Sequence, residues 1–174
     1  MQIGFIGAGK VATAFGQYLC NHGVAISGYY DRHDEKVARA AHATQSRPFS
    51  SAAAIAAGSD IIMITTRDDQ IAGVCETLCR QQCITGNHLV GHMSGAHSSR
   101  VLAAAFQKGA AVFSLHPLQA FADEEKALGQ LPQTYFSLEG DDPRLGTIKQ
   151  LLAKVGNPYF CLSPEHKSLY HLSA

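Results

Sequence analysis

Residues 1–23, MQIGFIGAGKVATAFGQYLCNHG, decide the fold of this chain. The apolar run at residues 3–6 predicts a short buried strand, residues 7–12 (GAGKVA) predict a tight turn, and the next residues suit a helix that ends before Gly23. A strand, a G-x-G-x-x-A turn and a helix in this order form a dinucleotide-binding fingerprint.

The chemistry of a nucleotide explains the residue types in this turn. Gly7 allows the tight turn, Gly9 lets the backbone approach a pyrophosphate, and Ala12 lets the helix pack closely on the strand. The helix N-terminus adds free N–H groups and a partial positive charge. A glycine-rich turn can also serve only to pack a βα unit, but we predict here a cofactor site formed by Gly7, Ala8, Gly9, Lys10 and Val11.

Length and charge exclude several classes of protein. The 174 residues suit one domain, and 14 Lys and Arg balance 14 Asp and Glu, so no basic surface for nucleic acid is expected. No apolar run approaches the roughly 18 residues that cross a bilayer, and the N-terminus lacks the basic residues of a signal peptide. We expect a soluble, cytoplasmic protein with a small-molecule substrate and no nucleic-acid or membrane partner.

The five cysteines do not form a disulfide or metal pattern. Cys75, Cys79 and Cys83 are spaced by four residues and would lie along one stripe of a helix. Structural zinc sites use closer pairs from turns, so buried free thiols are expected and no metal site is predicted.

Apolar strand patterns alternate with helical patterns along the chain. This alternation predicts βαβ units in a doubly wound, mainly parallel Rossmann-type sheet with helices on both faces. The sequence assigns residues 1–162 to this NAD(P)-binding domain and residues 163–174 to the start of a truncated helical domain. Strands are expected at residues 24–30, 47–49, 60–66, 88–93, 111–115, 134–139 and 159–162, and helices at residues 34–43, after a cap at Ser50, from residue 68, at 98–108, near 123–128 and at 143–155.

The end of the second strand predicts the cofactor preference. Asp31 lies 22 positions after Gly9, close to the spacing of an acid that binds the ribose 2′-hydroxyl of NAD. Arg32 could instead hold the 2′-phosphate of NADP, with Lys36 adding positive charge, or could only pair with nearby acids on the surface. We expect NADP, and NAD stays open.

Three segments are expected at the carboxyl ends of the strands, where ligands of open α/β sheets bind. The first contains Thr65, Thr66 and Arg67, which line the cofactor or cap the next helix. The second, residues 92–99, contains Ser94 and Gly95, a hydroxyl beside a residue that permits close approach. The third contains His116, whose backbone is fixed by the following proline. Among the nine histidines, His92 and His116 are distinguished by lying at strand ends, although each could be a structural histidine.

Three stretches carry a resemblance to a known family. The segments IGFIGAGKVATAF, HMSGAHSS and GAAVFSLHPLQAFAD resemble the Rossmann-like and DUF2520 oxidoreductases, whose Rossmann part is grouped with coenzyme F420-dependent NADP oxidoreductases and pyrroline-5-carboxylate reductases. The resemblance covers essentially the whole chain. It departs from the family at His97, where Leu is usual, and at Asp31, where a small polar residue is frequent.

The resemblance implies roles for further residues. Related β-hydroxyacid dehydrogenases place a Ser-Gly loop beside the nicotinamide and a lysine early in the following helix, which correspond to Ser94, Gly95 and Lys167. A helical domain follows the Rossmann part in this family, and Tyr170 and His171 match its opening helix. We therefore expect a homodimer formed through that domain.

Together these patterns predict an NADP(H)-dependent oxidoreductase that transfers a hydride to or from a small carbonyl, imine or hydroxy compound. Ser94 and His116 would bind or polarise the substrate, and Lys167 or His171 would relay the proton. Lys167 and His171 could also be a surface pair without a catalytic role. The chain alone is expected to bind cofactor with little turnover. The alternative is a non-enzymatic NAD(P)-binding or redox-sensing module.

Overall fold

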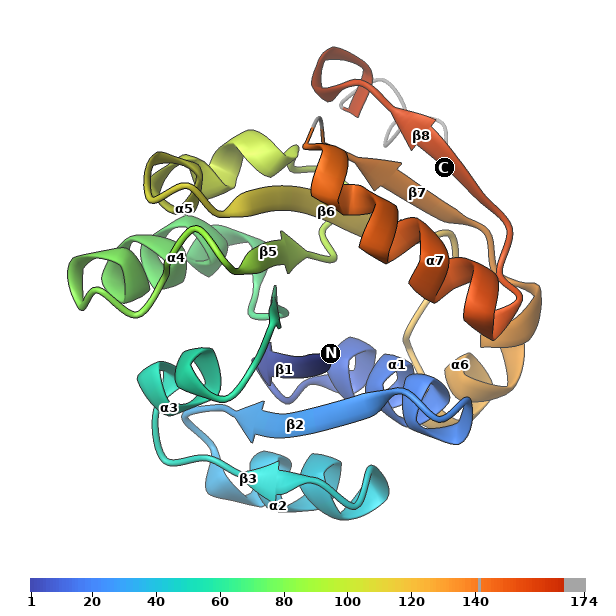
Figure 1. Ribbon diagram of the computed structural model, residues 1–174. Coiled ribbons are helices and arrows are strands. Elements are labelled where there is room, and N and C mark those ends of the chain that lie inside the picture. The colour runs from blue at the N-terminus through green and yellow to red at the C-terminus, as the bar shows by residue number, and fades with distance from the viewer. Residues whose placement is uncertain (141, 168–174) are drawn as a thin grey trace.

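The computed structural model describes residues 1–140 and 142–167, and within them eight strands form one sheet (Figure 1). The strand order is β3-β2-β1-β4-β5-β6-β7-β8, and all neighbours are parallel except β6 and β7. The strands are β1 Gln2–Ile6, β2 Ala25–Tyr30, β3 Arg47–Pro48, β4 Ile61–Ile64, β5 Leu89–His92, β6 Ala111–Pro117, β7 Phe136–Glu139 and β8 Tyr159–Leu162. The predicted doubly wound, mainly parallel fold is confirmed.

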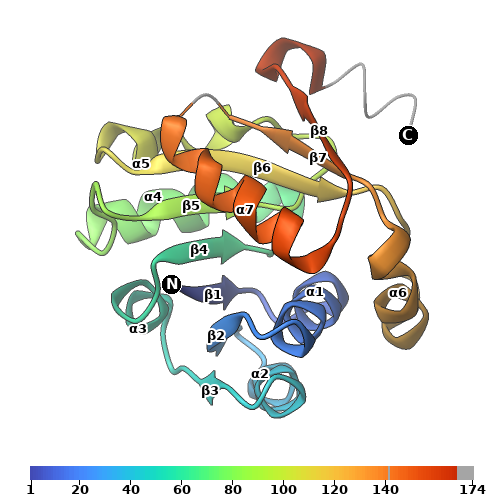
Figure 2. The same cartoon turned by 45° about the vertical axis from the view of Figure 1, so that its right-hand side comes forward.

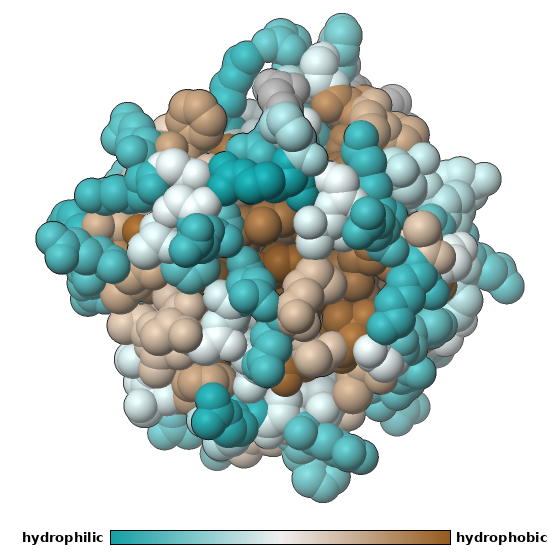
Figure 3. Space-filling view, viewed as in Figure 1, coloured by the Kyte–Doolittle hydropathy of each residue, from teal (hydrophilic) through white to brown (hydrophobic). Residues whose placement is uncertain are grey.

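Helices cover both faces of the sheet (Figures 1 and 2). One face packs against α1 (Lys10–Asn21), α2 (Asp34–Ala43), α6 (Glu124–Gln130) and α7 (Gly146–Val155). The other packs against α3 (Ala52–Ala57), α4 (Ile71–Arg80) and α5 (Ala103–Gln107). Each face has its own apolar core, because successive strand residues point to opposite sides. Figure 3, drawn in the view of Figure 1, shows hydrophobic residues mainly near the centre of this face and hydrophilic residues mainly around its rim.

Five short 3₁₀ turns lie among the described residues, and three of them begin helices that the sequence predicted as single segments. They are η1 (Asp68–Gln70) before α4, η2 (Ser99–Leu102) before α5, η3 (Leu131–Gln133) after α6, η4 (Pro143–Leu145) before α7 and η5 (Pro164–His166) after β8. Glycines end two helices as expected, with Gly23 at φ +68° and Gly156 at φ +80°.

One local prediction needs correction, and one strand direction was left open by the sequence. The cap of α3 is Ser51 and not Ser50, because the extended backbone of Ser51 places its hydroxyl 3.2 Å from the Ala54 N–H. The strand β7 runs antiparallel to β6, because the chain between them folds back through α6 and η3 instead of crossing over the sheet.

Cys75 and Cys79 lie on α4 as buried free thiols in the core, whereas the half-buried Cys83 follows the end of this helix at Arg80, so the predicted stripe contains two cysteines and not three. Burial raises the pKa of the Cys75 thiol to about 12, so it stays protonated. Among residues 1–140 and 142–167, no group of three or more His, Cys, Asp or Glu side chains could hold a metal ion. None of the helices in this part of the chain is long and apolar enough to cross a membrane.

Candidate functional site

The strand order reverses between β1 and β4, and ligands of open α/β sheets bind beside such a switch point, at the carboxyl ends of the strands. The glycine turn after β1 lies there. Gly7 adopts φ +106°, and a Cβ at this residue would lie 2.6 Å from the backbone of Thr65, so only glycine fits. At Gly9 a Cβ would meet nothing within 4 Å. Gly7 thus packs the turn, whereas Gly9 leaves open space above it, as the fingerprint requires.

The first turn of α1 has the donors that a diphosphate needs. Gly9 is the N-cap and no side chain caps the helix, so the N–H groups of Lys10 and Val11 have no partner within it. Unpaired N–H groups at a helix N-terminus favour an anion. The Lys10 ammonium donates a hydrogen bond to the carbonyl of Ala122, in the segment that leads from β6 to α6. The residues present therefore fit a nucleotide diphosphate.

The two threonines after β4 play different parts. Thr65 Oγ1 donates to the carbonyl of Gly7 at 2.9 Å, a bond that holds the glycine turn against β4. Thr66 Oγ1 is buried and has no hydrogen-bond partner among the described residues. A buried hydroxyl without a partner is costly and calls for an explanation. A ligand bound beside the glycine turn would supply the missing partner. Arg67 is exposed and its guanidinium lies 3.4 Å from a carboxylate oxygen of Asp69.

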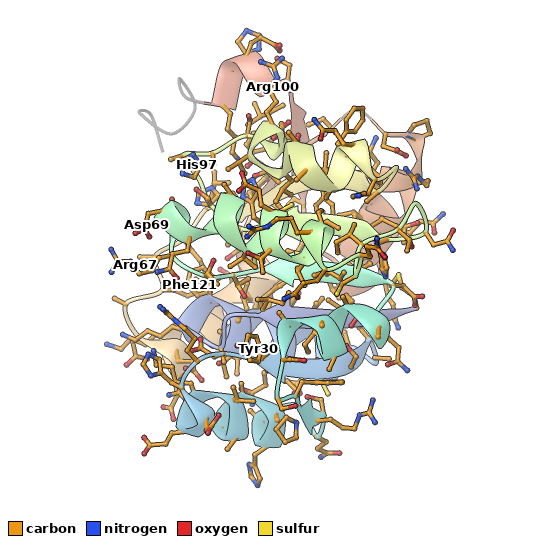
Figure 4. The ribbon with its side chains drawn as sticks, turned by 90° about the vertical axis from the view of Figure 1, so that its left-hand side faces the viewer. Tyr30, Arg67, Asp69, His97, Arg100 and Phe121 are labelled. Atoms are coloured by element: carbon orange, nitrogen blue, oxygen red, sulfur yellow. The ribbon has the colours of Figure 1, made fainter. Side chains whose placement is uncertain are left out.

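The ends of β4, β5 and β6 bring their loops to one edge of the molecule. Figure 4 shows Arg67, Asp69, His97 and Phe121 along this edge. The three segments predicted from the sequence are therefore neighbours.

Asp31 and Arg32 point to different surroundings. The Asp31 carboxylate accepts from the Ala8 N–H at 2.9 Å and from the His33 N–H at 3.0 Å, so it ties the glycine turn to the start of α2. Arg32 is exposed and has one long contact, 3.5 Å to Gln70 Oε1. No ion pair of Arg32 with Asp34 or Glu35 occurs among the described residues.

A second group of polar side chains lies in the sheet itself. The register places His92 of β5 beside Ser114 of β6, and Ser114 beside Glu139 of β7. His116 lies opposite Ser137 one step further along. His92, Ser114, Ser137 and Glu139 are each 0% exposed, on the sheet face that is otherwise apolar beneath α3, α4 and α5. Buried polar groups of this kind need partners.

Ser94 fixes the loop after β5. Its hydroxyl donates to Asp68 at 2.7 Å and accepts from the N–H groups of Ala96 and His97 at 3.2 Å. Its own N–H donates to His92 Nδ1 at 3.2 Å. Gly95 is buried within the same loop. Ser94 therefore links the loops after β4 and β5.

His92 is a neutral histidine. Its Nδ1 accepts from Ser94, so Nε2 carries the proton and donates to the Ser98 carbonyl at 3.2 Å. Burial lowers the pKa of His92 to about 4; the hydrogen bond to Ser98 opposes this shift, and the nearby charge of Lys167 contributes to it. His92 thus holds the 94–99 loop and stays neutral near pH 7.

Lys167 follows η5 and reaches the same polar group. It is 1% exposed, and its Nζ donates to Ser137 Oγ at 3.3 Å. Burial lowers the pKa of Lys167 to about 8, while the Glu139 carboxylate acts in the opposite direction. The predicted lysine therefore lies among the strand-end residues with a pKa near the range useful for proton transfer. His116 is half-buried on β6, and His171 lies outside the described residues.

Sequence reasoning missed two members of this arrangement, Asp68 and Glu139. Asp68 accepts from Ser94, and Glu139 accepts from the Ser99 N–H at 2.5 Å and the Ser99 hydroxyl at 2.7 Å. The available signal was the alternation of residues 134–139, which ends on a carboxylate at an inward position, followed by Gly140.

Comparison with known proteins agrees with this geometry. The chain has the fold of protein TM1727 from Thermotoga maritima (24% identity, TM-score 0.72, 98% of this chain and 61% of that chain). It shares this fold with a Bacteroides fragilis protein whose suggested activity is that of an NADP oxidoreductase (18%, 0.84, 99% and 64%) and with the imine reductase of Streptomyces aurantiacus (14%, 0.81, 99% and 60%).

The chain thus spans about three fifths of the length of these solved structures. No curated protein sequence matches it. The family model of Rossmann-like domains matches residues 1–117, which contain the glycine turn, both loops that Ser94 links, and His116. The chain belongs to the Rossmann-like domain family.

Proposed function

We propose that this domain binds NADP(H) and serves an oxidoreductase that transfers a hydride to or from a small carbonyl, imine or hydroxy compound. The observation that carries the proposal is the glycine turn, with open space above Gly9, uncapped amides at Lys10 and Val11, and the orphaned Thr66 hydroxyl beside it. The imine reductase and the oxidoreductase that share the fold support the reaction class. The resemblance to DUF2520 oxidoreductases points the same way.

We assign the residues as follows. The amides of the glycine turn hold the diphosphate, and Arg32, which has no close ion pair among the described residues, receives the 2′-phosphate of NADP. Because both oxygens of Asp31 already accept backbone N–H groups, we assign this carboxylate to the glycine turn and not to the ribose. NADP is therefore favoured over NAD. The bound nicotinamide supplies the hydride chemistry.

The substrate is assigned to the edge formed by the 94–99 loop and His116. Ser94 donates to Asp68, so it would polarise a substrate only by exchanging that hydrogen bond for one to the substrate. Lys167 is assigned the proton, because its pKa of about 8 lets Nζ both hold and release a proton at mildly alkaline pH.

Binding is tested by Gly9→Val. The side chain would enter the space assigned to the diphosphate, and its Cβ would meet no protein atom within 4 Å, so we expect NADPH affinity to fall by roughly a hundredfold, about 2.7 kcal/mol, in calorimetry. Gly73→Val is the matched control, since a Cβ at Gly73 of α4 also meets nothing within 4 Å. Unchanged affinity in Gly9→Val would place the nucleotide elsewhere.

Turnover is tested by following NADPH oxidation with a panel of small ketones, aldehydes and cyclic imines. We expect oxidation with at least one class and a strong loss of kcat in Lys167→Met. Tight NADPH binding without oxidation of any substrate, in a longer protein that contains this domain, would favour a redox-sensing module instead.

A further inference from the structure

Glu139 is a fully buried carboxylate that the assignments above leave without a role. It ends β7 at 0% exposure, next to Ser114 in the register of the sheet. Its two oxygens accept from the Ser99 N–H at 2.5 Å and the Ser99 Oγ at 2.7 Å. Removing a carboxylate from water is expensive unless charge or hydrogen bonds compensate it.

The contacts of Glu139 reach two parts of the proposed site. Through Ser99 it holds the start of η2, directly after the loop that contains Ser94 and Gly95. The positive charge of Lys167 lies near enough for the carboxylate to favour the ammonium form. One side chain of β7 therefore touches the end of the loop and acts electrostatically on the lysine.

We propose that Glu139 is a positioning residue of this site, which fixes the 94–99 loop through Ser99 and serves as the anionic neighbour of Lys167. The inference rests on the proposed function for the meaning of the loop and the lysine. It concerns a residue that neither the glycine motif nor the family match, which ends at residue 117, contains.

The other titratable groups near the lysine lie elsewhere. His92 on β5 is neutral, with its proton on Nε2, and His116 lies on β6. His97 and Asp68 lie in the loops and affect the pKa of His92. At the surface, Arg100 of η2 pairs with Glu165, and Figure 4 shows Arg100 beside η5. Among the described residues, the carboxylate that raises the pKa of Lys167 is that of Glu139.

Two substitutions separate the two effects of Glu139. Glu139→Gln removes the charge but keeps both contacts, because the Ser99 hydroxyl can rotate to accept from the amide. Ser99→Ala removes the side-chain contact and keeps the charge. Glu165→Gln is the matched control, since it removes a carboxylate two residues before Lys167 and breaks the ion pair with Arg100 without touching Glu139.

The first measurement is the titration of Lys167, followed by the ¹³Cε signal of labelled lysine and assigned by its absence in Lys167→Met. We expect Glu139→Gln to lower the pKa of Lys167 by about one pH unit, because a neighbouring opposite charge is lost. Ser99→Ala and Glu165→Gln should leave it nearly unchanged. A purely structural role of Glu139 would not move this signal.

The second measurement is amide hydrogen exchange in residues 94–99, with kcat and KM where turnover is found. Ser99→Ala should exchange faster there and lose roughly ten- to a hundredfold in kcat/KM, because the loop is misplaced. Glu139→Gln should keep the exchange rates and shift the pH dependence of kcat to lower pH.

The outcomes separate this proposal from the proposed function. Lysine titration and exchange need no cofactor, so they test Glu139 even if NADPH does not bind. An unchanged Lys167 titration in Glu139→Gln, or unchanged exchange in Ser99→Ala, overturns the positioning role. If Glu139→Gln does not fold, Ser99→Ala still tests the tether.

Discussion

Asp31 and Arg32, which follow β2, have different roles that the sequence could not distinguish. Asp31 accepts the N–H groups of Ala8 and His33, which secures the glycine turn to α2. Arg32 extends into solvent, with its contact to Gln70 at 3.5 Å. At the scale of single residues, Asp31 therefore holds the backbone in place, whereas the exposed Arg32 guanidinium is accessible to a ligand.

Arg32→Ala should weaken NADP binding more than NAD binding by about 1.5–3 kcal/mol, the size of a charge-assisted hydrogen bond. Titration calorimetry with both cofactors measures the difference. Arg80→Ala, at the C-terminal end of α4, is the control for a general loss of positive charge. Equal losses for NADP and NAD would show that Arg32 does not contact the 2′-phosphate.

His92 makes the stability of the fold sensitive to acid. Its folded pKa of about 4 lies below the ordinary value of 6.5, so the unfolded chain binds the proton more readily. The stability that the fold gains from keeping His92 neutral is fully present above pH 6.5 and is lost as the pH falls towards 4. Urea unfolding of the wild type and of His92→Gln should differ in pH dependence over this window by up to about 3 kcal/mol. Parallel profiles for the two proteins would contradict the buried neutral histidine.

At the scale of elements, glycines allow α1 to lie close to the sheet. Gly16 is buried in α1, and a Cβ there would lie 1.9 Å from the Tyr29 hydroxyl of β2 and 3.3 Å from Phe5 of β1. The first helix of the nucleotide motif thus depends on a small residue where it crosses β2, in addition to the glycines of the turn.

Gly16→Ala should destabilise the protein by about 1–3 kcal/mol, because the Tyr29 ring has no room to move in the core. Gly73→Ala in α4 should stabilise it by about 0.5–1 kcal/mol, because its Cβ meets nothing and alanine favours the helix. Thermal or urea unfolding of both variants checks the opposite signs. Stabilisation by Gly16→Ala would show that α1 does not pack this closely on the sheet.

The loop after β5 shows how elements far apart in the sequence shape one site. Ser94 bonds to Asp68 after β4, Ser99 to Glu139 at the end of β7, and Arg100 to Glu165 of η5. Three separate connections therefore fix one short segment at the carboxyl edge of the sheet.

At the scale of the whole molecule, nucleotide binding should stabilise the folded chain against heat. At a concentration of one hundred times Kd, the gain is about 2.7 kcal/mol, which corresponds to a Tm increase of roughly 5–10 °C in a domain of this size. NADPH should raise Tm more than NADH at equal concentration. An increase of the same size in Gly9→Val would indicate binding outside the glycine turn.

The sequence by itself determined the features that depend on neighbouring residues. The spacing of Gly7, Gly9 and Ala12 after an apolar run predicted the first βα unit, and the alternation of strand and helix patterns predicted the doubly wound sheet. Most helix and strand centres agreed, because periodicity and turn residues act locally. The helix predicted at residues 143–155 is preceded by Asp142, whose carboxylate accepts the Arg144 N–H.

Only the tertiary structure decided which polar residues meet. Glu139 contacts a residue 40 positions earlier, and Lys167 contacts one 30 positions earlier, so no local pattern relates them. The row of His92, Ser114 and Glu139 exists because β7 turned antiparallel to β6 and set its register there. The direction of the Asp31 side chain was likewise undecided by spacing, since it depends on which backbone N–H groups lie within its reach.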